Sequence, residues 1–173
     1  MEEYFDTYDI NGNFLGVQPK SYCHSPEATC YHKPVWIWIY NDQGQFLVQR
    51  RSPLKKKGAN KWDIPSAGHV QAGEKIIDAC VRETKEELGL SVDKKEFVFL
   101  KEWLNGGGKE FVQTFILKLN VPISAMTLQE EEVAEVKWLN FDEFKELLYS
   151  DDFCGHAAEY KDWLCKTLAQ YVK

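Results

Sequence analysis

The sequence lacks any hydrophobic run long enough to cross a membrane. Its longest strongly apolar stretch is VWIWIY at residues 35–40, whereas a membrane-spanning helix needs about 20 residues. The N-terminal MEEYFDTYD is acidic, while a secretory signal starts with basic residues followed by an apolar segment. We therefore expect no membrane association and a cytoplasmic location.

The sequence also lacks an excess of positive charge and a disulfide framework. Lys and Arg number 21 against 27 Asp and Glu, which gives a formal net charge of −6. Proteins that bind nucleic-acid polymers usually show a basic face, so such a partner is not expected. The five cysteines are odd in number and lack the spacing of a secreted scaffold, which favours reduced thiols.

What is present predicts one globular domain over residues 1–173. Apolar residues make up 44% of the chain and no low-complexity run occurs, so a substantial core is expected. Strand patterns lie before and after a central helix, and two helices follow, which favours an α/β sandwich with a mixed sheet. Asn11-Gly12 predicts a hairpin turn with two residues at positive φ. The amphipathic C-terminal helix, residues 157–172, suits packing in the core or against a second subunit, which leaves a homodimer open.

Residues 68–90, GHVQAGEKIIDACVRETKEELGL, carry the strongest chemical signal. Helical spacing gathers Glu83, Glu86 and Glu87 beside an apolar stripe. Carboxylates at this spacing repel one another, and negative charge in the last turn opposes the helix dipole. A solvated charged face is one interpretation. The other is a metal platform, because Mg²⁺ binds through carboxylates and substrate phosphate oxygens.

The order of residues in this stretch resembles the Nudix box. The matching residues are Gly68, Glu74 and Arg82-Glu83-Thr84-Lys85-Glu86-Glu87-Leu88-Gly89-Leu90, with Thr84 in place of the usual aliphatic residue. The resemblance implies a Nudix-type α/β/α sandwich with a mixed β-sheet and a loop–helix–loop catalytic box. It also implies an enzyme that uses Mg²⁺ or Mn²⁺ to hydrolyse a small molecule containing a diphosphate linkage. The implied metal ligands are Glu83, Glu86 and Glu87, helped by the Gly68 carbonyl and Glu74.

Further residues are expected to complete the site. Glu74 is predicted in the first helical turn, and Arg82 is predicted to hold the box carboxylates in place. Arginine can grip phosphate with two parallel hydrogen bonds, which makes the basic segment a candidate for binding the diphosphate. This segment contains Arg50, Arg51, Lys55, Lys56 and Lys57. Arg50, Arg51 and Lys55 are its candidate binding residues, and the resemblance described next adds Lys20. The candidate catalytic carboxylates are Glu86, Glu87 and Glu132. The attacking water would be deprotonated by Glu87 or by one of Glu131 and Glu132.

A second resemblance extends over most of the chain. Lys20, His24, His32, Trp62, Gly68-His69 and Glu110 together are similar to the isopentenyl-diphosphate isomerase branch of the Nudix superfamily. In those isomerases histidines bind a metal, which implies a possible second site for Zn²⁺ or Mn²⁺ at His24, His32, His69 and Glu110. Otherwise, the histidines would be structural.

Residue 67 decides between two enzymatic interpretations. The isomerases carry a proton-transferring cysteine immediately before Gly68-His69, and this chain has Ala67 there. Alanine can neither donate nor accept a proton. The sequence therefore favours a metal-dependent diphosphate hydrolase acting on a nucleoside-diphosphate-type or other phosphorylated small molecule. An isomerase-like enzyme is the alternative, and a non-catalytic sensor of a diphosphate ligand is the second.

Overall fold

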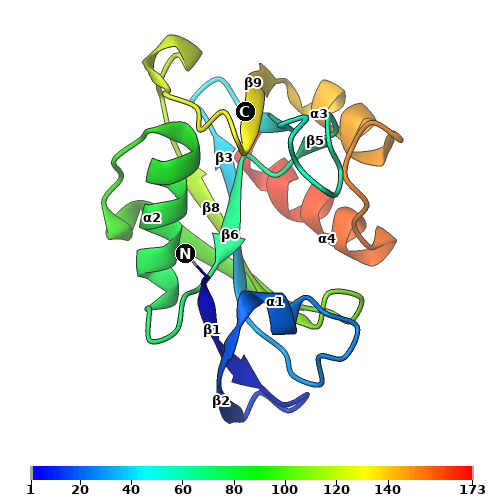
Figure 1. The fold of residues 1–173 in the computed structure, drawn as a ribbon. Coiled ribbons are helices and arrows are strands. Elements are labelled where there is room, and N and C mark those ends of the chain that lie inside the picture. Colours follow the sequence, from blue (N-terminus) through cyan, green and yellow to red (C-terminus); the bar gives the residue numbers. More distant parts are fainter. Residues whose placement is uncertain (1, 173) are drawn as a thin grey trace.

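The protein folds as a mixed β-sheet with helices on both faces, in a computed structural model that describes residues 2–172 (Figure 1). A separate two-stranded sheet is formed by β1 (Tyr4–Tyr8) and β2 (Phe14–Pro19). The main sheet contains β3 (Pro34–Tyr40), β4 (Phe46–Arg51), β5 (Trp62–Asp63), β6 (Ser66–His69), β7 (Phe97–Asn105), β8 (Glu110–Lys118) and β9 (Val133–Leu139). The α-helices are α1 (Lys20–Cys23), α2 (Ile76–Leu88), α3 (Phe141–Tyr149) and α4 (Ala158–Leu168). Three short 3-10 turns are η1 (Lys94–Glu96), η2 (Ile123–Ala125) and η3 (Ala169–Tyr171).

Strand β3 organises the main sheet. It runs parallel to β8 and antiparallel to β4 and β6, while β5 and β9 pair with β4 and β7 pairs with β8. Strands β3 and β4 share one register pair, Tyr40 with Phe46. The opposite end of β3 therefore pairs with β6, which places Gly68 beside Val35.

The alternation of side chains along β3 builds two cores. Val35, Ile37 and Ile39 are fully buried in a cluster that includes Ala79, Cys80 and Leu88 of α2. Trp38 belongs to a second cluster with residues of α3 and α4, and Trp36 and Tyr40 pack against it. Because successive residues of a strand point to opposite faces, the two clusters lie on the two sides of the sheet. The predicted α/β/α sandwich with a mixed sheet is confirmed.

Helix α2 ends where the sequence predicted but begins later. Gly89 has φ 71° and closes the helix in the left-handed conformation that glycine adopts readily. The first residue of the helix is Ile76, preceded by Lys75 at the N-cap. Glu74 therefore lies in the turn before the helix, and its predicted place in the first helical turn is wrong.

The N-terminal hairpin forms, but its turn differs from the predicted one. Asp9 accepts hydrogen bonds from the N–H groups of Asn11 and Asn13, both at 2.9 Å. Gly12 has φ 82°, and Asn11 is outside the positive-φ set of residues 2–172. The expectation of two consecutive positive-φ residues was wrong, because the Asp9 carboxylate organises a longer connection.

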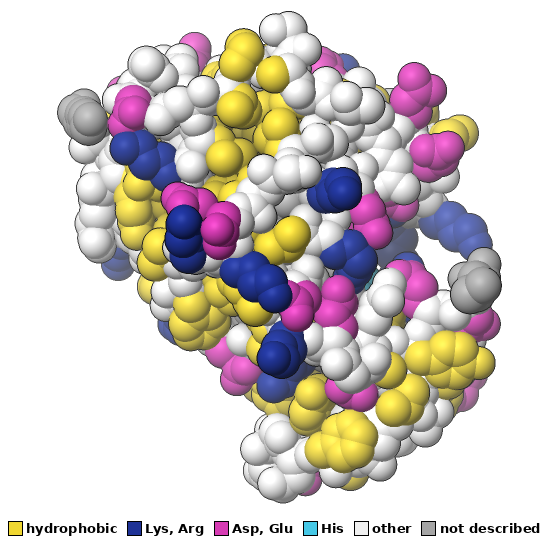
Figure 2. Space-filling model, turned by 90° about the vertical axis from the view of Figure 1, so that its left-hand side faces the viewer, with side chains coloured by type: hydrophobic (Ala, Val, Ile, Leu, Met, Phe, Trp, Pro, Cys, Tyr) yellow, Lys and Arg dark blue, Asp and Glu magenta, His cyan; other side chains and the backbone are white. Residues whose placement is uncertain are grey.

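The surface around α2 carries side chains of both charges. Acidic and basic side chains are interspersed on the face that includes this helix (Figure 2). Within residues 2–172, no helix is both long and apolar enough to cross a membrane. The C-terminal α4 buries Tyr160, Leu164 and Leu168 in the second core cluster, as expected for core packing.

Candidate metal and diphosphate site

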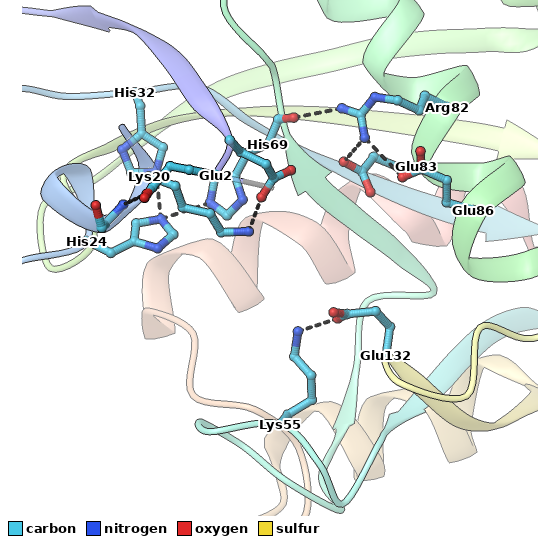
Figure 3. A network of polar contacts seen from close by, with 12 residues as sticks. Glu2, Lys20, His24, His32, Lys55, His69, Arg82, Glu83, Glu86 and Glu132 are labelled. Carbon is cyan, nitrogen blue, oxygen red and sulfur yellow. Dashed lines mark hydrogen bonds and ion pairs between the residues drawn. The ribbon is translucent and has the colours of Figure 1, made fainter. Parts of the chain in front are cut away.

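Strand β6 separates two groups of polar side chains. Strand alternation directs Ser66 and Gly68 toward α2, and Ala67 and His69 toward the opposite face. An added Cβ at Gly68 would meet Glu83 of α2, while Ala67 packs against the cluster that contains α4. Figure 3 shows the two groups on either side of this strand, with histidines on one side and the carboxylates of α2 on the other.

Gly68 lets a helix carboxylate approach the strand backbone. A Cβ built at this position would lie 1.9 Å from the Glu83 carboxyl carbon and 2.0 Å from Oε1. A side chain at this position would require the Glu83 carboxylate to move, because a Cβ does not come closer than about 3 Å to such atoms. The glycine is therefore required for the packing of Glu83 against β6.

Substituting Gly68 with alanine is expected to destabilise the fold by about 1–3 kcal/mol through overpacking. It should also displace Glu83. Thermal unfolding and turnover with Mg²⁺ measure the two effects. The matched control is Gly106→Ala, where an added Cβ meets nothing within 4 Å and the change should stay within about 0.5 kcal/mol. Equal behaviour of the two variants would contradict the close approach.

Arg82 ties the carboxylates of the box together. Its Nε and Nη2 donate to the two oxygens of Glu74, each at 2.9 Å. Its Nη1 donates to Glu83 at 2.6 Å and to Glu86 at 3.1 Å, and Nη2 also reaches the His69 carbonyl at 2.8 Å (Figure 3). The predicted holding role of Arg82 is confirmed. Glu86 is the most open of the three carboxylates, with its side chain 50% exposed.

Glu87 is the most buried carboxylate of α2, and it accepts a hydrogen bond from the Ala67 N–H at 2.9 Å. Burial raises the pKa of Glu87 to about 8; the Ala67 bond opposes the rise, and the charges of Glu83 and Glu132 add to it. Burial likewise raises the pKa of Glu83, although Arg82 counteracts it. Burial thus disfavours the ionised form of both side chains, and a divalent cation would compensate their charge and favour ionisation.

The raised pKa of Glu87 predicts a pH-dependent stability in metal-free protein. The folded chain keeps this proton up to about pH 8, whereas the unfolded chain loses it near the ordinary pKa of 4.5. The folded state binds more protons in this window, so stability falls as the pH rises through it. Glu87→Gln should reduce the fall in unfolding temperature between about pH 5 and about pH 8 by at least about 2 °C. An identical fall in both proteins would contradict the assignment.

The four predicted diphosphate-binding residues lie in different surroundings. Lys55 forms an ion pair with Glu132 (Figure 3), and Glu132 is close enough to act on the charge of Glu87. Arg51 donates to Asp63 at 3.0 Å and to the Lys57 carbonyl at 3.2 Å. Arg50 contacts Glu135 at 3.8 Å, and Lys20 pairs with Glu3. The structure thus joins Lys55 to Glu132, whose charge acts on Glu87 of the box. Arg51 instead binds groups of its own loop and Asp63.

Three histidines and one glutamate converge on the other side of β6. His24 follows α1, His32 precedes β3, His69 ends β6 and Glu110 begins β8. The Nε2 atom of His24 lies 3.3 Å from the Nε2 atoms of both His32 and His69. Glu110 Oε1 lies 3.6 Å from His32 and 3.8 Å from His69, and one ligand atom from each residue falls within 4.8 Å of all the others.

This geometry and protonation fit a metal ion. Nitrogens bound to one tetrahedral Zn²⁺ lie about 3.3 Å apart, given Zn–N bonds of about 2.0–2.1 Å. Burial lowers the pKa of His32 to about 4 and that of His24 below its usual range, so both imidazoles are neutral at pH 7. Burial raises the pKa of Glu110, but the bond and charge of His69 outweigh it and leave a carboxylate. Neutral imidazole and carboxylate are the forms that bind metal.

Two features of this region were not predicted from the sequence. Asp63, whose side chain is 13% exposed, bridges Arg51 to His156, whose Nε2 lies 3.2 Å from the carboxylate. Glu3 reaches Lys20 from the N-terminal segment. Neither pair is marked by a local pattern, because each joins residues from separate segments of the chain.

The comparisons with known proteins agree with this architecture. A family model described as the NUDIX domain matches residues 31–160. The chain belongs to the Nudix family. Nudix hydrolase 3 of Arabidopsis thaliana is 36% identical over 163 residues, which cover 87% of this chain but only 21% of that protein. An uncharacterized Nudix hydrolase of Clostridium acetobutylicum is 33% identical over 156 residues, covering 85% of this chain and 74% of that one.

Relatives with a different name also occur within the family. An isopentenyl-diphosphate Delta-isomerase of Cutibacterium acnes is 32% identical over 152 residues, covering 82% of this chain and 76% of that protein. Among solved structures, a Deinococcus radiodurans protein superposes with a TM-score of 0.76 over 99% of this chain and 100% of its own, at 19% identity. This likeness shows that the two proteins share a fold over their whole length.

Proposed function

We propose that this Nudix hydrolase cleaves a diphosphate linkage in a nucleoside-diphosphate-type or other phosphorylated small molecule with Mg²⁺ or Mn²⁺. The observation that carries the proposal is the burial of Glu83 and Glu87 against a strand in which Gly68 lets the Glu83 carboxylate approach closely. Two buried carboxylates with raised pKa values are costly for stability alone. Cation binding at this place gives them a function.

Glu83, Glu86 and Glu87 would hold the cation, together with the Gly68 carbonyl. Bound there, a divalent cation supplies Lewis acidity that neutralises charge on phosphate oxygens and acidifies water. Both oxygens of Glu74 already accept hydrogen bonds from Arg82. We therefore assign Glu74 to orienting Arg82, which in turn fixes Glu83 and Glu86, rather than to the cation.

In the proposed reaction Lys55 binds the diphosphate and Glu132 accepts a proton. Their ion pair is partly exposed, at 26% and 37% of the side chains, so a diphosphate oxygen can replace Glu132 as the partner of Lys55. The exchange binds the substrate and releases Glu132. The freed carboxylate accepts a proton from water as the water oxygen bonds to phosphorus and the bridging P–O bond breaks. The bridging oxygen leaves with the other product.

His24, His32, His69 and Glu110 form the proposed second metal site, which suits Zn²⁺ or Mn²⁺. Four protein ligands complete the coordination of a tetrahedral ion, as in structural zinc sites. We assign this site to fastening α1 and the ends of β3, β6 and β8 beside the box. Arg82 connects the two sites because it donates to the His69 carbonyl.

A panel of diphosphate compounds assayed with Mg²⁺ and with Mn²⁺ tests the proposal. The panel includes nucleoside diphosphates, nucleotide sugars, dinucleotides, coenzyme A and prenyl diphosphates, and both products are identified by mass. Cleavage of at least one diphosphate bond that requires the cation supports the proposal. Calorimetric binding without turnover across the whole panel would instead favour a sensor.

Isomerisation of isopentenyl diphosphate is the second candidate function. The isomerase-named relative and the convergence of three histidines with Glu110 favour it. Ala67 disfavours isomerisation, because its methyl group cannot transfer a proton. Following isopentenyl diphosphate by NMR distinguishes the two activities. Migration of the double bond supports isomerisation, whereas release of phosphate without the isomer supports hydrolysis.

A further inference from the structure

The N-terminal segment lies across the edge of the candidate site. The Tyr4 carbonyl accepts the Ala72 N–H at 2.8 Å, and the Asp6 carboxylate accepts the Gly73 N–H at 3.1 Å. On its other side, the Glu3 carbonyl accepts the Lys20 N–H at 2.8 Å. The segment is therefore bound both to the loop that follows β6 and to the start of α1.

These backbone contacts direct the Glu3 carboxylate to positive groups of the site. It forms an ion pair with Lys20 Nζ, and the two side chains remain 34% and 42% exposed. Burial raises the pKa of Glu3, but the hydrogen bond and charge of Lys20 outweigh it, and His69 and Arg82 lower it further. The carboxylate thus lies within electrostatic reach of both the histidine cluster and the box. Figure 3 shows Lys20 and His69 near each other at this edge.

We infer that Glu3 is an internal competitor for the phosphate groups of the substrate at Lys20. The inference rests on the proposed function and extends it, because it adds Lys20 to Lys55 as a group that binds the diphosphate. In the free protein the Glu3 carboxylate neutralises Lys20 and must be displaced before another anion binds this lysine. A diphosphate carries more negative charge and several acceptor oxygens, so it replaces Glu3 at this lysine. Each binding event then includes the loss of the Glu3–Lys20 contact, which weakens substrate binding and raises KM.

The test is the variant Glu3→Gln, which keeps the shape of the side chain and removes its charge. Methylenediphosphonate, whose P–C–P bridge resists hydrolysis, is titrated calorimetrically in the presence of Mn²⁺. For a partly exposed ion pair the expected gain in affinity is about two- to fivefold. KM for a substrate found in the panel should fall by the same factor, with kcat unchanged.

Glu2→Gln is the matched control. It removes the same charge from the neighbouring residue, whose carboxylate accepts the Ser21 N–H at 3.0 Å, and a glutamine carbonyl can keep that bond. Its affinity for methylenediphosphonate should equal that of the wild type. A second control is Lys20→Gln, in which the added Glu3→Gln change should have no effect on affinity.

Three results would overturn the inference. They are unchanged or weaker binding in Glu3→Gln, an equal gain in Glu2→Gln, and a gain that persists without Lys20. Because methylenediphosphonate binding needs no turnover, the outcomes separate the two proposals. Tighter binding by Glu3→Gln with no hydrolysis across the panel supports the competitor and contradicts the hydrolase. Hydrolysis of a panel compound, together with unchanged methylenediphosphonate binding by Glu3→Gln, supports the hydrolase and contradicts the competitor.

Discussion

Glu87→Gln is expected to lower kcat/KM for the diphosphate substrate by about 10²–10⁴-fold, the range reached when a catalytic proton-transfer or charge-stabilising group is lost. The glutamine oxygen can still accept the hydrogen bond from the Ala67 N–H that Glu87 receives at 2.9 Å. The amide carries no charge for a cation. Turnover should therefore fall although the fold is kept, which steady-state kinetics and thermal unfolding establish together.

The control for this variant is Asp78→Asn on the same helix. Asp78 pairs with Lys94 at 2.5 Å on the surface of the protein, and surface pairs contribute about 0–1 kcal/mol. Its turnover should stay within about twofold of the wild type. A folded Glu87→Gln protein with full metal-dependent turnover would contradict the role of the box.

His32→Asn is expected to weaken metal binding at the histidine cluster by at least about a hundredfold, since even outer partners of metal ligands contribute 10- to 100-fold. His32 is fully buried and supplies one of three converging nitrogens. Metal at 100 times its Kd stabilises a folded protein by about 2.7 kcal/mol, so the unfolding temperature in added Zn²⁺ should fall by about 5–10 °C. Metal content after dialysis measures the binding directly.

The remaining histidine offers the control for that experiment. His156 pairs with Asp63 at 3.2 Å and lies outside the group of converging ligands. His156→Gln should retain the metal content of the wild type, whatever its effect on stability. If His32→Asn binds as much Zn²⁺ as His156→Gln, the cluster is not a metal site.

The box could be predicted from the sequence because its contacts are local. Helical spacing alone brings Arg82 to Glu86, and Gly89 ends the helix by its own conformational freedom. The position of Glu74 was predicted wrongly because only its local preference was considered. A carboxylate suits a first helical turn, but here it accepts hydrogen bonds from Gln71 and Arg82 before the helix begins.

The burial of the box carboxylates depends on packing between distant segments. The spacing in α2 predicted Glu83 and Glu87 beside an apolar stripe, but did not indicate that β6 would cover them. That contact exists because β6 pairs with β3 and Gly68 has no side chain. Glu3 and Lys20 are likewise joined only when the N-terminal segment binds the loop after β6.

The histidine cluster could be predicted only through resemblance. His24 and His32 are eight positions apart and His69 lies far along the chain, a spacing that matches no familiar zinc motif. Three separate elements fix their convergence. Resemblance to the isomerase branch indicated the same four residues that the fold brings together, whereas composition and periodicity did not.

Hydrolysis in water enriched in ¹⁸O tests the central claim most directly. The panel compounds are incubated with the wild type and Mg²⁺, and the masses of the products are measured by mass spectrometry. Attack of water on phosphorus predicts one ¹⁸O atom in one of the two phosphate products, and far less product with Glu87→Gln. Conversion of isopentenyl diphosphate to its isomer, with the diphosphate intact and without ¹⁸O, would contradict the account.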